Sequence, residues 1–336
     1  MARFDPNHKT LHLSALEDAV VVLSGGSTGI GAATVKELFF RGANVIFGDV
    51  NDAAAEEVIK SISSEKVHYV KTDVRYYEDV RKLFQFALSR YGRVDHAIAN
   101  AGVLERPGWF DPRNSLDDLA KEPSTFTLDV NLTGVVFFTH LALTYLSQNN
   151  DGGAVDKSLT LLSSHGGFKE TPGMFLYSTA KHAVIGLMRS LRPYVANTFP
   201  GVRVNAVCPS MTRTNMVDGV VGDWQKGDLP VNGPEDIASV LVAIAAAGPG
   251  SDAMWYDEQE SPDLHARPSI GTTDWDNKLQ RGLHGRAIYV LGGQSYDIEE
   301  GLDKTEPIWL GKDASAKVKL AQQSLGVGDK WITGKR

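Results

Sequence analysis

Short apolar runs rich in β-branched residues alternate with longer amphipathic segments along most of this 336-residue chain. The amphipathic segments, such as 29–40, 53–61 and 79–90, have the length and periodicity of helices. The seven apolar runs are residues 19–23, 44–47, 67–70, 96–99, 159–162, 202–207 and 287–291. Such alternation predicts βαβ units with right-handed crossovers and parallel strands that are buried on both faces. We therefore expect an α/β protein with a doubly wound Rossmann fold, in which helices cover both faces of a seven-stranded parallel sheet.

The same pattern predicts a single domain, because all seven runs lie between residues 17 and 303. Residues 1–16 form a loose N-terminal arm in this interpretation, and residues 304–336 form a C-terminal tail with a helix over 314–325. The tail would dock on the core or on a partner subunit. Residues 248–284 are a polar insertion, which we interpret either as a lid or as a disordered loop, because connections of that length are commonly one or the other.

Composition excludes several other classes of protein. The net charge is −7, and lysine and arginine are scattered, so no nucleic acid partner is expected. The first 20 residues lack the apolar core of a signal peptide, and the longest apolar run, 241–247, is far too short to cross a membrane. Cys208 is the single cysteine, and His8 and His12 have no third ligand, so neither a disulfide nor a metal site is expected. We therefore expect a cytoplasmic location.

A glycine-rich segment, residues 24–31, lies between the first apolar run and the first helix. Glycine allows the backbone to turn tightly and to approach a pyrophosphate, which then binds the N–H groups at the helix N-terminus. Asp49 lies at the end of the next expected strand, where an acid hydrogen-bonds the adenosine ribose and repels a 2′-phosphate. No lysine or arginine lies in the loop, which favours NAD over NADP, although Asp49 would also serve as a turn or capping residue. The loop residues expected to bind the cofactor are Gly25, Ser27, Thr28, Gly29 and Ile30.

With these landmarks, residues 19–303 resemble the classical short-chain dehydrogenases/reductases. The resemblance implies further cofactor contacts from Asp73, Val74, Asn100, Ala101, Gly102, Tyr177, Lys181, Pro209, Met211 and Thr214. It also implies a catalytic tetrad of Asn131, Ser164, Tyr177 and Lys181. Phe47-Gly48-Asp49 and residues 299–302 are similar to the subgroup around 15-hydroxyprostaglandin dehydrogenase. Two positions depart from the family pattern: Ser24 stands where threonine is usual, and Ser210 stands where glycine is usual.

The catalytic chemistry can be argued from Tyr177 and Lys181 themselves. They are four residues apart in a helical segment and therefore share one face. A lysine cation about 4 Å from a phenol, at an effective dielectric near 20, is worth roughly 4 kcal/mol. Together with the oxidised nicotinamide, Lys181 would lower the pKa of the tyrosine toward that of a general base. Ser164 ends an apolar run, at the sheet edge where ligands bind, and would hold the substrate oxygen. The adjacent Ser163 is the alternative. The family resemblance implies that Asn131 orders a water molecule for proton relay.

Substrate contacts are predicted from the residues that flank the tetrad. His165, Phe168, Met174 and Met216 are the candidates, together with Val103, Leu104, Phe175 and Trp224. Because these side chains are mostly apolar, we expect a lipophilic or aromatic alcohol or ketone, although core packing would also explain each of them. His165 is alternatively a satisfied loop histidine, and Cys208 is interpreted as a core residue.

The sequence thus predicts an NAD-dependent oxidoreductase that interconverts a secondary alcohol and its ketone. A non-redox reaction on the same fold and a non-catalytic NAD-binding scaffold are the alternatives. The resemblance implies a homodimer or homotetramer formed through the helix that carries Tyr177 and the helix before it.

Overall fold

The computed structural model of the chain describes residues 2–8, 11, 13–148, 156–217, 219, 221–249, 254–256 and 282–325. Within them, ten strands form one sheet in the order β4-β3-β2-β5-β6-β7-β9-β10-β1-β8. The first seven strands in this order are parallel, and the last three are antiparallel. The order reverses beside β2, so the two halves of the sheet are wound in opposite directions from that point, as in a doubly wound fold.

All seven predicted parallel strands are confirmed. They are β2 (Val20–Ser24), β3 (Asn44–Asp49), β4 (Val67–Lys71), β5 (His96–Ala99), β6 (Lys157–Leu162), β7 (Val202–Pro209) and β9 (Ala287–Leu291). Three short strands extend the sheet beyond the prediction: β10 (Gln294–Asp297), β1 (Ala2–Phe4) and β8 (Met254–Tyr256).

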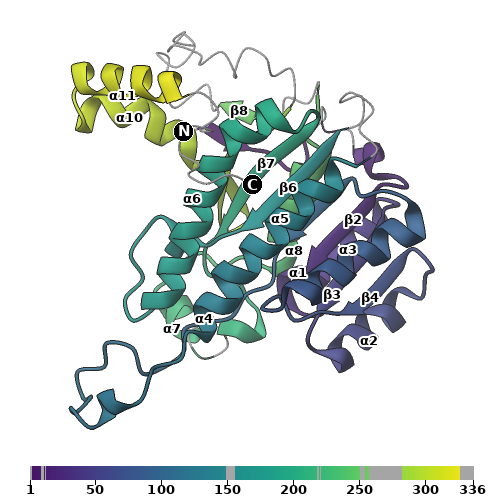
Figure 1. Cartoon of the computed structure of the whole chain (residues 1–336), viewed down its shortest axis with the longest axis horizontal. Coiled ribbons are helices and arrows are strands. Elements are labelled where there is room, and N and C mark those ends of the chain that lie inside the picture. The colour runs from purple at the N-terminus through teal and green to yellow at the C-terminus, as the bar shows by residue number, and fades with distance from the viewer. Residues whose placement is uncertain are drawn as a thin grey trace, which may run out of the picture.

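Helices cover both faces of the sheet (Figure 1). On one face lie α1 (Gly29–Phe40), α2 (Asp52–Ile62) and α8 (Pro234–Ala246), and on the other lie α3 (Tyr77–Tyr91), α5 (Gly134–Leu146) and α6 (Phe175–Thr198). Each face has its own buried apolar cluster, so two cores hold the sheet between them. Shorter elements are η1 (Leu13–Leu16), η2 (Asp118–Ala120), α4 (Phe126–Leu128), η3 (Asp129–Thr133), η4 (His165–Gly167), η5 (Asn215–Val217) and α7 (Val221–Lys226).

The N-terminal arm is part of the fold, which corrects the expectation of a loose segment. Strand β1 pairs with both β10 and β8. Phe4, Leu11 and Leu16 are buried in the core cluster on the side of α1 and α8. Removal of these three apolar side chains from water stabilises the docked arm. The few apolar residues among positions 1–16 form no pattern that predicts this packing.

The C-terminal boundary also differs from the prediction. Helix α10 (Ile298–Trp309) crosses the expected boundary at residue 303, and α11 (Lys312–Leu325) contains the helix predicted over 314–325. Figure 1 shows the pair extending away from the sheet.

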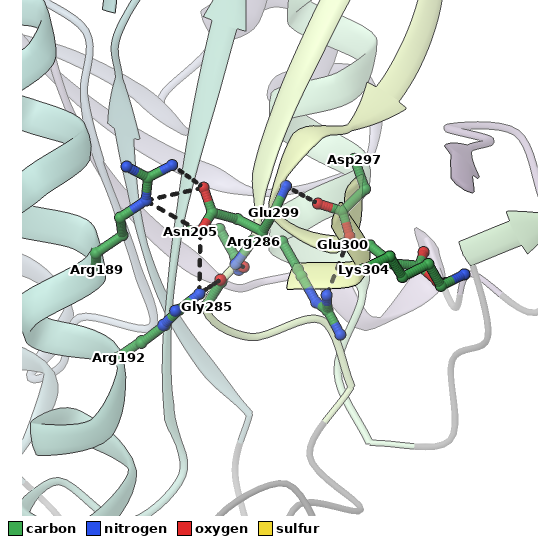
Figure 2. A network of polar contacts seen from close by, with 9 residues as sticks. All are labelled: Arg189, Arg192, Asn205, Gly285, Arg286, Asp297, Glu299, Glu300 and Lys304. Atoms are coloured by element: carbon green, nitrogen blue, oxygen red, sulfur yellow. Dashed lines mark hydrogen bonds and ion pairs between the residues drawn. The ribbon is translucent and has the colours of Figure 1, made fainter. Parts of the chain in front are cut away.

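Buried ion pairs anchor the start of α10. The Glu299 carboxylate, 2% exposed, accepts hydrogen bonds from Arg189 and Arg192 of α6 (Figure 2). Asp297, 1% exposed, caps the helix through the Glu299 N–H at 2.9 Å and pairs with Arg286. A buried charge is costly unless it is paired, so each acid requires its arginine partner.

Both ends of the 248–284 insertion lie at the amino end of the parallel strands. Leu283 donates its N–H to the Ala247 carbonyl at 2.8 Å. The fully buried Arg203, at the start of β7, hydrogen-bonds the Leu283 carbonyl and forms a bidentate pair with Asp156 at 2.7 Å. Both flanks are therefore fixed at the edge of the sheet opposite the strand ends Ser24, Asp49 and Leu162. The choice between lid and disordered loop concerns residues 250–253 and 257–281, which lie outside the described residues.

The helical stretch Phe126–Leu146 is long and apolar enough to cross a membrane by length and composition. However, 56% of its apolar window is buried inside the protein. Phe138 packs on Phe84 of α3, with ring centroids 4.9 Å apart, as expected for a core helix.

Candidate active site

The glycine loop turns between β2 and α1 in a conformation that only glycine tolerates well. Gly25 has φ of +72°, and a Cβ there would lie 2.7 Å from the Cα of Ala101. A Cβ on Gly31 would lie 1.8 Å from the Gly25 carbonyl oxygen. Thr28 precedes α1 without a side-chain cap, so the first N–H groups of this helix remain available for an anion.

The segment 100–102 fixes the glycine loop from the side. The Ser24 hydroxyl accepts hydrogen bonds from the N–H groups of Asn100 at 3.1 Å and Ala101 at 3.2 Å. The Asn100 amide donates to the Gly25 carbonyl at 2.7 Å. Ser24 therefore supplies the hydroxyl that the family usually takes from threonine.

Asp49 lies at the carboxyl end of β3, beside the glycine loop. One carboxylate oxygen accepts the Ser27 N–H at 3.0 Å, and the other accepts the N–H groups of Val50 and Asn51 at 2.7 and 3.0 Å. Asp49 thus acts as a turn residue and also lies beside the dinucleotide loop.

Lys71 is a nearby cation that the sequence did not point to; it donates to the Val50 carbonyl at 2.9 Å and pairs with Asp52. A cation is therefore present near this turn, with a carboxylate beside it.

The remaining predicted cofactor residues lie along the same edge of the sheet. Asp73 pairs with Arg75, which lowers the pKa of Asp73, and Val74 is buried. Thr214 lies beside Gly29, because a Cβ on that glycine would be 2.9 Å from the Thr214 methyl group. Pro209 ends β7, and Gly102 lies beside Asn131 and Lys181.

Asn232 holds the segment that follows β7. Its amide donates to the Ser210 and Thr212 hydroxyls and to the Val290 carbonyl, and its own N–H donates to the Met211 carbonyl at 2.9 Å. Ser210 does not adopt a positive φ, so the family's glycine is not needed for backbone reasons here. No local pattern predicts Asn232, because the partners of its side chain are 20 to 61 residues away.

The structure brings Ser164 and Tyr177 together. The Ser164 hydroxyl is close enough to the phenol to lower the pKa of Tyr177, and Ser164 also accepts the Gly166 N–H at 3.2 Å. Ser163, the alternative, instead donates to the Lys181 carbonyl at 2.8 Å and is buried. The geometry therefore selects Ser164 as the serine that faces the tyrosine.

Lys181 and Asn131 complete the cluster from two other elements. The Lys181 Nζ lies 5.7 Å from the centroid of the Tyr177 ring and donates to the Leu162 carbonyl at 2.9 Å. Asn131 lies in a π-helical turn, a feature that is frequent at functional sites. Its amide forms two 2.8 Å hydrogen bonds with Val103, one to the N–H and one to the carbonyl.

Burial is the main influence on the pKa values of Tyr177 and Lys181. Burial raises the pKa of Tyr177, and the hydrogen bond with Ser164 opposes this shift. Burial also lowers the pKa of Lys181 to about 8. Desolvation of the phenolate is therefore the dominant effect in the protein alone. The expected lowering of the Tyr177 pKa by Lys181 together with the oxidised nicotinamide stays a prediction.

The predicted substrate residues divide into two groups. His165 and Phe168 pack on Tyr289 of β9, and His165 is hydrogen-bonded to its hydroxyl at 3.2 Å. Met174 precedes α6, and Met216 is 42% exposed in η5.

Cys208 is fully buried, which raises its thiol pKa to about 12, so it is not a nucleophile.

These residues fit a dinucleotide. The loop provides a positive-φ glycine and uncapped helix N–H groups, and the buried Ser27 hydroxyl has no hydrogen-bond partner within the described part of the chain. Among the residues that the structure describes, no cluster of three or more His, Cys, Asp or Glu could hold a metal ion.

Comparison with known proteins agrees with this geometry. Residues 19–224 match the short chain dehydrogenase family. The chain is 30% identical, over 91% of its length and 84% of the relative, to the short-chain dehydrogenase/reductase prx4 of Penicillium roqueforti. It is 31% identical, over 69% of its length and 91% of the relative, to cis-4-hydroxycyclohexanecarboxylate dehydrogenase of Sinomonas cyclohexanicum.

Among solved structures, the fold is similar to a 3-ketoacyl-(acyl-carrier-protein) reductase from Brucella melitensis complexed with NADH. The TM-score is 0.63 and the identity is 22%, over 83% of this chain and 98% of that one. The chain belongs to the short-chain dehydrogenase/reductase family of oxidoreductases, whose members bind nicotinamide cofactors.

Proposed function

We propose that this protein is an NAD-dependent dehydrogenase that interconverts a lipophilic or aromatic secondary alcohol and its ketone. The observation that carries the proposal is the placement of the buried Lys181 ammonium 5.7 Å from the centroid of the Tyr177 ring, with the Ser164 hydroxyl on the phenol side. A scaffold would have no chemical use for a cation buried against a phenol, because burial of the cation costs free energy that folding must recover elsewhere.

The reaction moves one proton through the protein. Ser164 holds the substrate oxygen, and the ionised Tyr177 oxygen takes the hydroxyl proton of the alcohol. A nicotinamide held by the glycine loop and Asp49 would supply the acceptor for the carbinol hydrogen and its electron pair. The positive charges of Lys181 and of that ring favour the phenolate and so oppose the effect of burial. Ketone reduction follows the same path in reverse.

NAD is favoured over NADP by Asp49. Its carboxylate lies against the Ser27 N–H, on the side of the loop where the adenosine ribose is expected, and a 2′-phosphate would meet its negative charge. The charge of Lys71 is already matched by Asp52. The NADH complex of the Brucella melitensis structure supports the same class of cofactor.

The apolar character of the substrate is supported by the loop before α4. Trp109 and Phe110 stack near Phe175 at the start of α6, with 5.1 Å between the centroids of Phe110 and Phe175. The named cyclic substrate of the Sinomonas relative is consistent with a ring-bearing alcohol.

The test is an initial-rate assay of purified protein with NAD and a panel of cyclic and aromatic secondary alcohols, in parallel with Tyr177→Phe. We expect NADH formation that falls by a factor of about 10² to 10⁴ in the variant. Product formation without NADH would indicate a non-redox reaction, and cofactor binding without any product would indicate a scaffold.

We also propose a homodimer or homotetramer assembled through α5 and α6. The outer face of α5 carries Val136, His140 and Thr144, which are four residues apart along one exposed stripe. Val136 is 41% exposed. An apolar side chain in that position would be buried by packing against a second copy.

A further inference from the structure

The segment after β5 touches two members of the tetrad within three residues. Val103 binds the Asn131 amide through both its N–H and its carbonyl. Two residues later, the Glu105 Oε2 accepts the backbone N–H of Tyr177 at 2.7 Å. Residues 103–105 therefore bridge Asn131 and Tyr177, which are 46 positions apart in the sequence.

The hydrogen bond from Tyr177 to Glu105 occupies a position where a helix lacks partners. Tyr177 is the third residue of α6, and the first four N–H groups of a helix have no acceptor inside the helix. Met174, at the N-cap, supplies no side-chain acceptor. Glu105 thus provides the acceptor from outside, and its negative charge also suits the positive end of the helix dipole.

The same loop forms one wall of a cleft of about 400 Å³ beside the start of α6. Glu105, Trp109 and Phe110 line one side, and Gly173 and Phe175 line the other. Phe110 meets Phe175 edge to face. A group bound in this cleft would therefore contact both the loop and the first turn of the helix that carries Tyr177.

Within the described part of the chain, the second oxygen of Glu105 makes no further hydrogen bond that would hold the side chain. Oε1 is buried and has no hydrogen-bond partner among the residues that the structure describes. Buried polar atoms are nearly always paired, so an unpaired one calls for an explanation. Among the described residues, the Tyr177 N–H is therefore the hydrogen-bond partner on which the placement of the Glu105 carboxylate depends.

We propose that Glu105 is a positioning residue for the reaction. Through its hydrogen bond to the Tyr177 N–H, it couples the seating of the 104–125 loop to the placement of Tyr177. A ring-bearing substrate that packs on Trp109 and Phe110 thereby orders the tyrosine that takes its proton. This inference rests on the proposed function for its kinetic consequence, whereas the coupling itself is a property of the protein alone.

Two substitutions at Glu105 separate positioning from simple packing. Glu105→Gln keeps an acceptor oxygen for the Tyr177 N–H, and Glu105→Ala removes it. Glu122→Ala, an exposed acid on the same loop, is the matched control. We expect Glu105→Ala to lower kcat about tenfold to a hundredfold, with KM changed less than about threefold. Glu105→Gln should recover most of kcat, and Glu122→Ala should match the wild type.

Hydrogen exchange provides a measurement that does not depend on turnover. The Tyr177 amide should exchange at least about tenfold faster in Glu105→Ala, and close to the wild-type rate in Glu105→Gln. Phe110→Ala, which leaves Glu105 in place but removes the contact with Phe175, should also accelerate this exchange if loop and helix are coupled.

Unchanged exchange at Tyr177 in Glu105→Ala would overturn the proposal. A rise in KM alone would also overturn it, because that result would make Glu105 a residue that only lines the cleft. If wild-type protein oxidises no alcohol in the panel while the exchange pattern is as expected, the proposed function fails and the coupling stands.

Discussion

At the residue scale, adjacent serines at the end of β6 have different roles. Ser164 faces Tyr177, whereas Ser163 bonds the Lys181 carbonyl. We predict that Ser164→Ala lowers kcat/KM about a hundredfold, because the substrate oxygen loses a donor. Ser163→Ala should instead cost about 1 kcal/mol of unfolding free energy, for one buried hydrogen bond, with kcat nearly unchanged. Steady-state kinetics and urea unfolding of both variants check this, and the opposite pattern would assign the reactive role to Ser163.

Asp49 offers a second test at this scale, on the cofactor. Asp49→Asn retains an oxygen acceptor for the turn N–H groups but removes the negative charge. We expect the ratio of kcat/KM for NAD to that for NADP to fall by about tenfold or more, because repulsion of the 2′-phosphate disappears. An unchanged ratio would mean that Asp49 acts only in the turn, and that another group selects the cofactor.

Residues of the site were predictable where the signal is local in the sequence. Tyr177 and Lys181 lie four positions apart, and the glycine loop is contiguous. Glu105 and Asn232 were not predictable, because their partners are distant: Tyr177 is 72 positions from Glu105, and Val290 is 58 from Asn232. Side-chain-to-backbone hydrogen bonds of this kind leave no spacing pattern.

At the element scale, the seven parallel strands were predictable because each is a buried, β-branched run. The antiparallel extension was not predictable. Strand β1 has three residues and β10 has four, with the polar sequence Gln294-Ser295-Tyr296-Asp297. Strand β1 depends on pairing with β8 and β10, which lie about 250 to 290 positions away, whereas β10 pairs along its length with the neighbouring β9. Neither β1 nor β10 has an apolar pattern of its own.

The start of α10 predicts a pH effect on stability. Burial raises the pKa of Asp297 from 3.8 to about 6. A folded-state pKa above the unfolded value means that the folded state binds the proton more tightly. The contribution of this group is therefore fully present below about pH 4 and is lost as pH rises through about 6. Asp297→Asn keeps the cap acceptor for the Glu299 N–H but cannot titrate.

We expect the unfolding free energy of the wild type, relative to Asp297→Asn, to fall by up to about 3 kcal/mol between pH 4 and pH 7. Urea unfolding of both proteins at several pH values measures this difference. A difference that is flat, or that rises with pH, would show that the ion pair with Arg286 outweighs burial.

At the scale of the whole molecule, the two ends of the parallel sheet carry different features. Ser24, Asp49 and Ser164 lie together at the carboxyl ends of the parallel strands. Ligands bind at this edge of the sheet in this class of fold. The amino end carries the flanks of the 248–284 insertion and the Arg203–Asp156 pair. Sequence position alone could not show that the insertion is anchored away from the site, because that depends on the topology of α8 and β9.

The proposed assembly gives a prediction at this scale. Val136→Arg places a charge on the exposed stripe of α5 and should convert the oligomer to a monomer, because an unpaired charge would be buried at the interface. Phe40→Arg, at an exposed position of α1 on the opposite face of the sheet, is the control and should leave the mass unchanged. Light scattering coupled to size exclusion measures both. A monomeric wild-type protein would contradict the assembly.

The most direct test of the central claim is isotope transfer during a single turnover. A secondary alcohol that is active in the panel would carry deuterium on its carbinol carbon, and mass spectrometry would be applied to the recovered cofactor. We predict that deuterium appears in the reduced nicotinamide in one-to-one proportion to ketone. Tyr177→Phe should lower the rate of both without changing this ratio. Ketone or another product formed without deuterium in the cofactor would contradict the account.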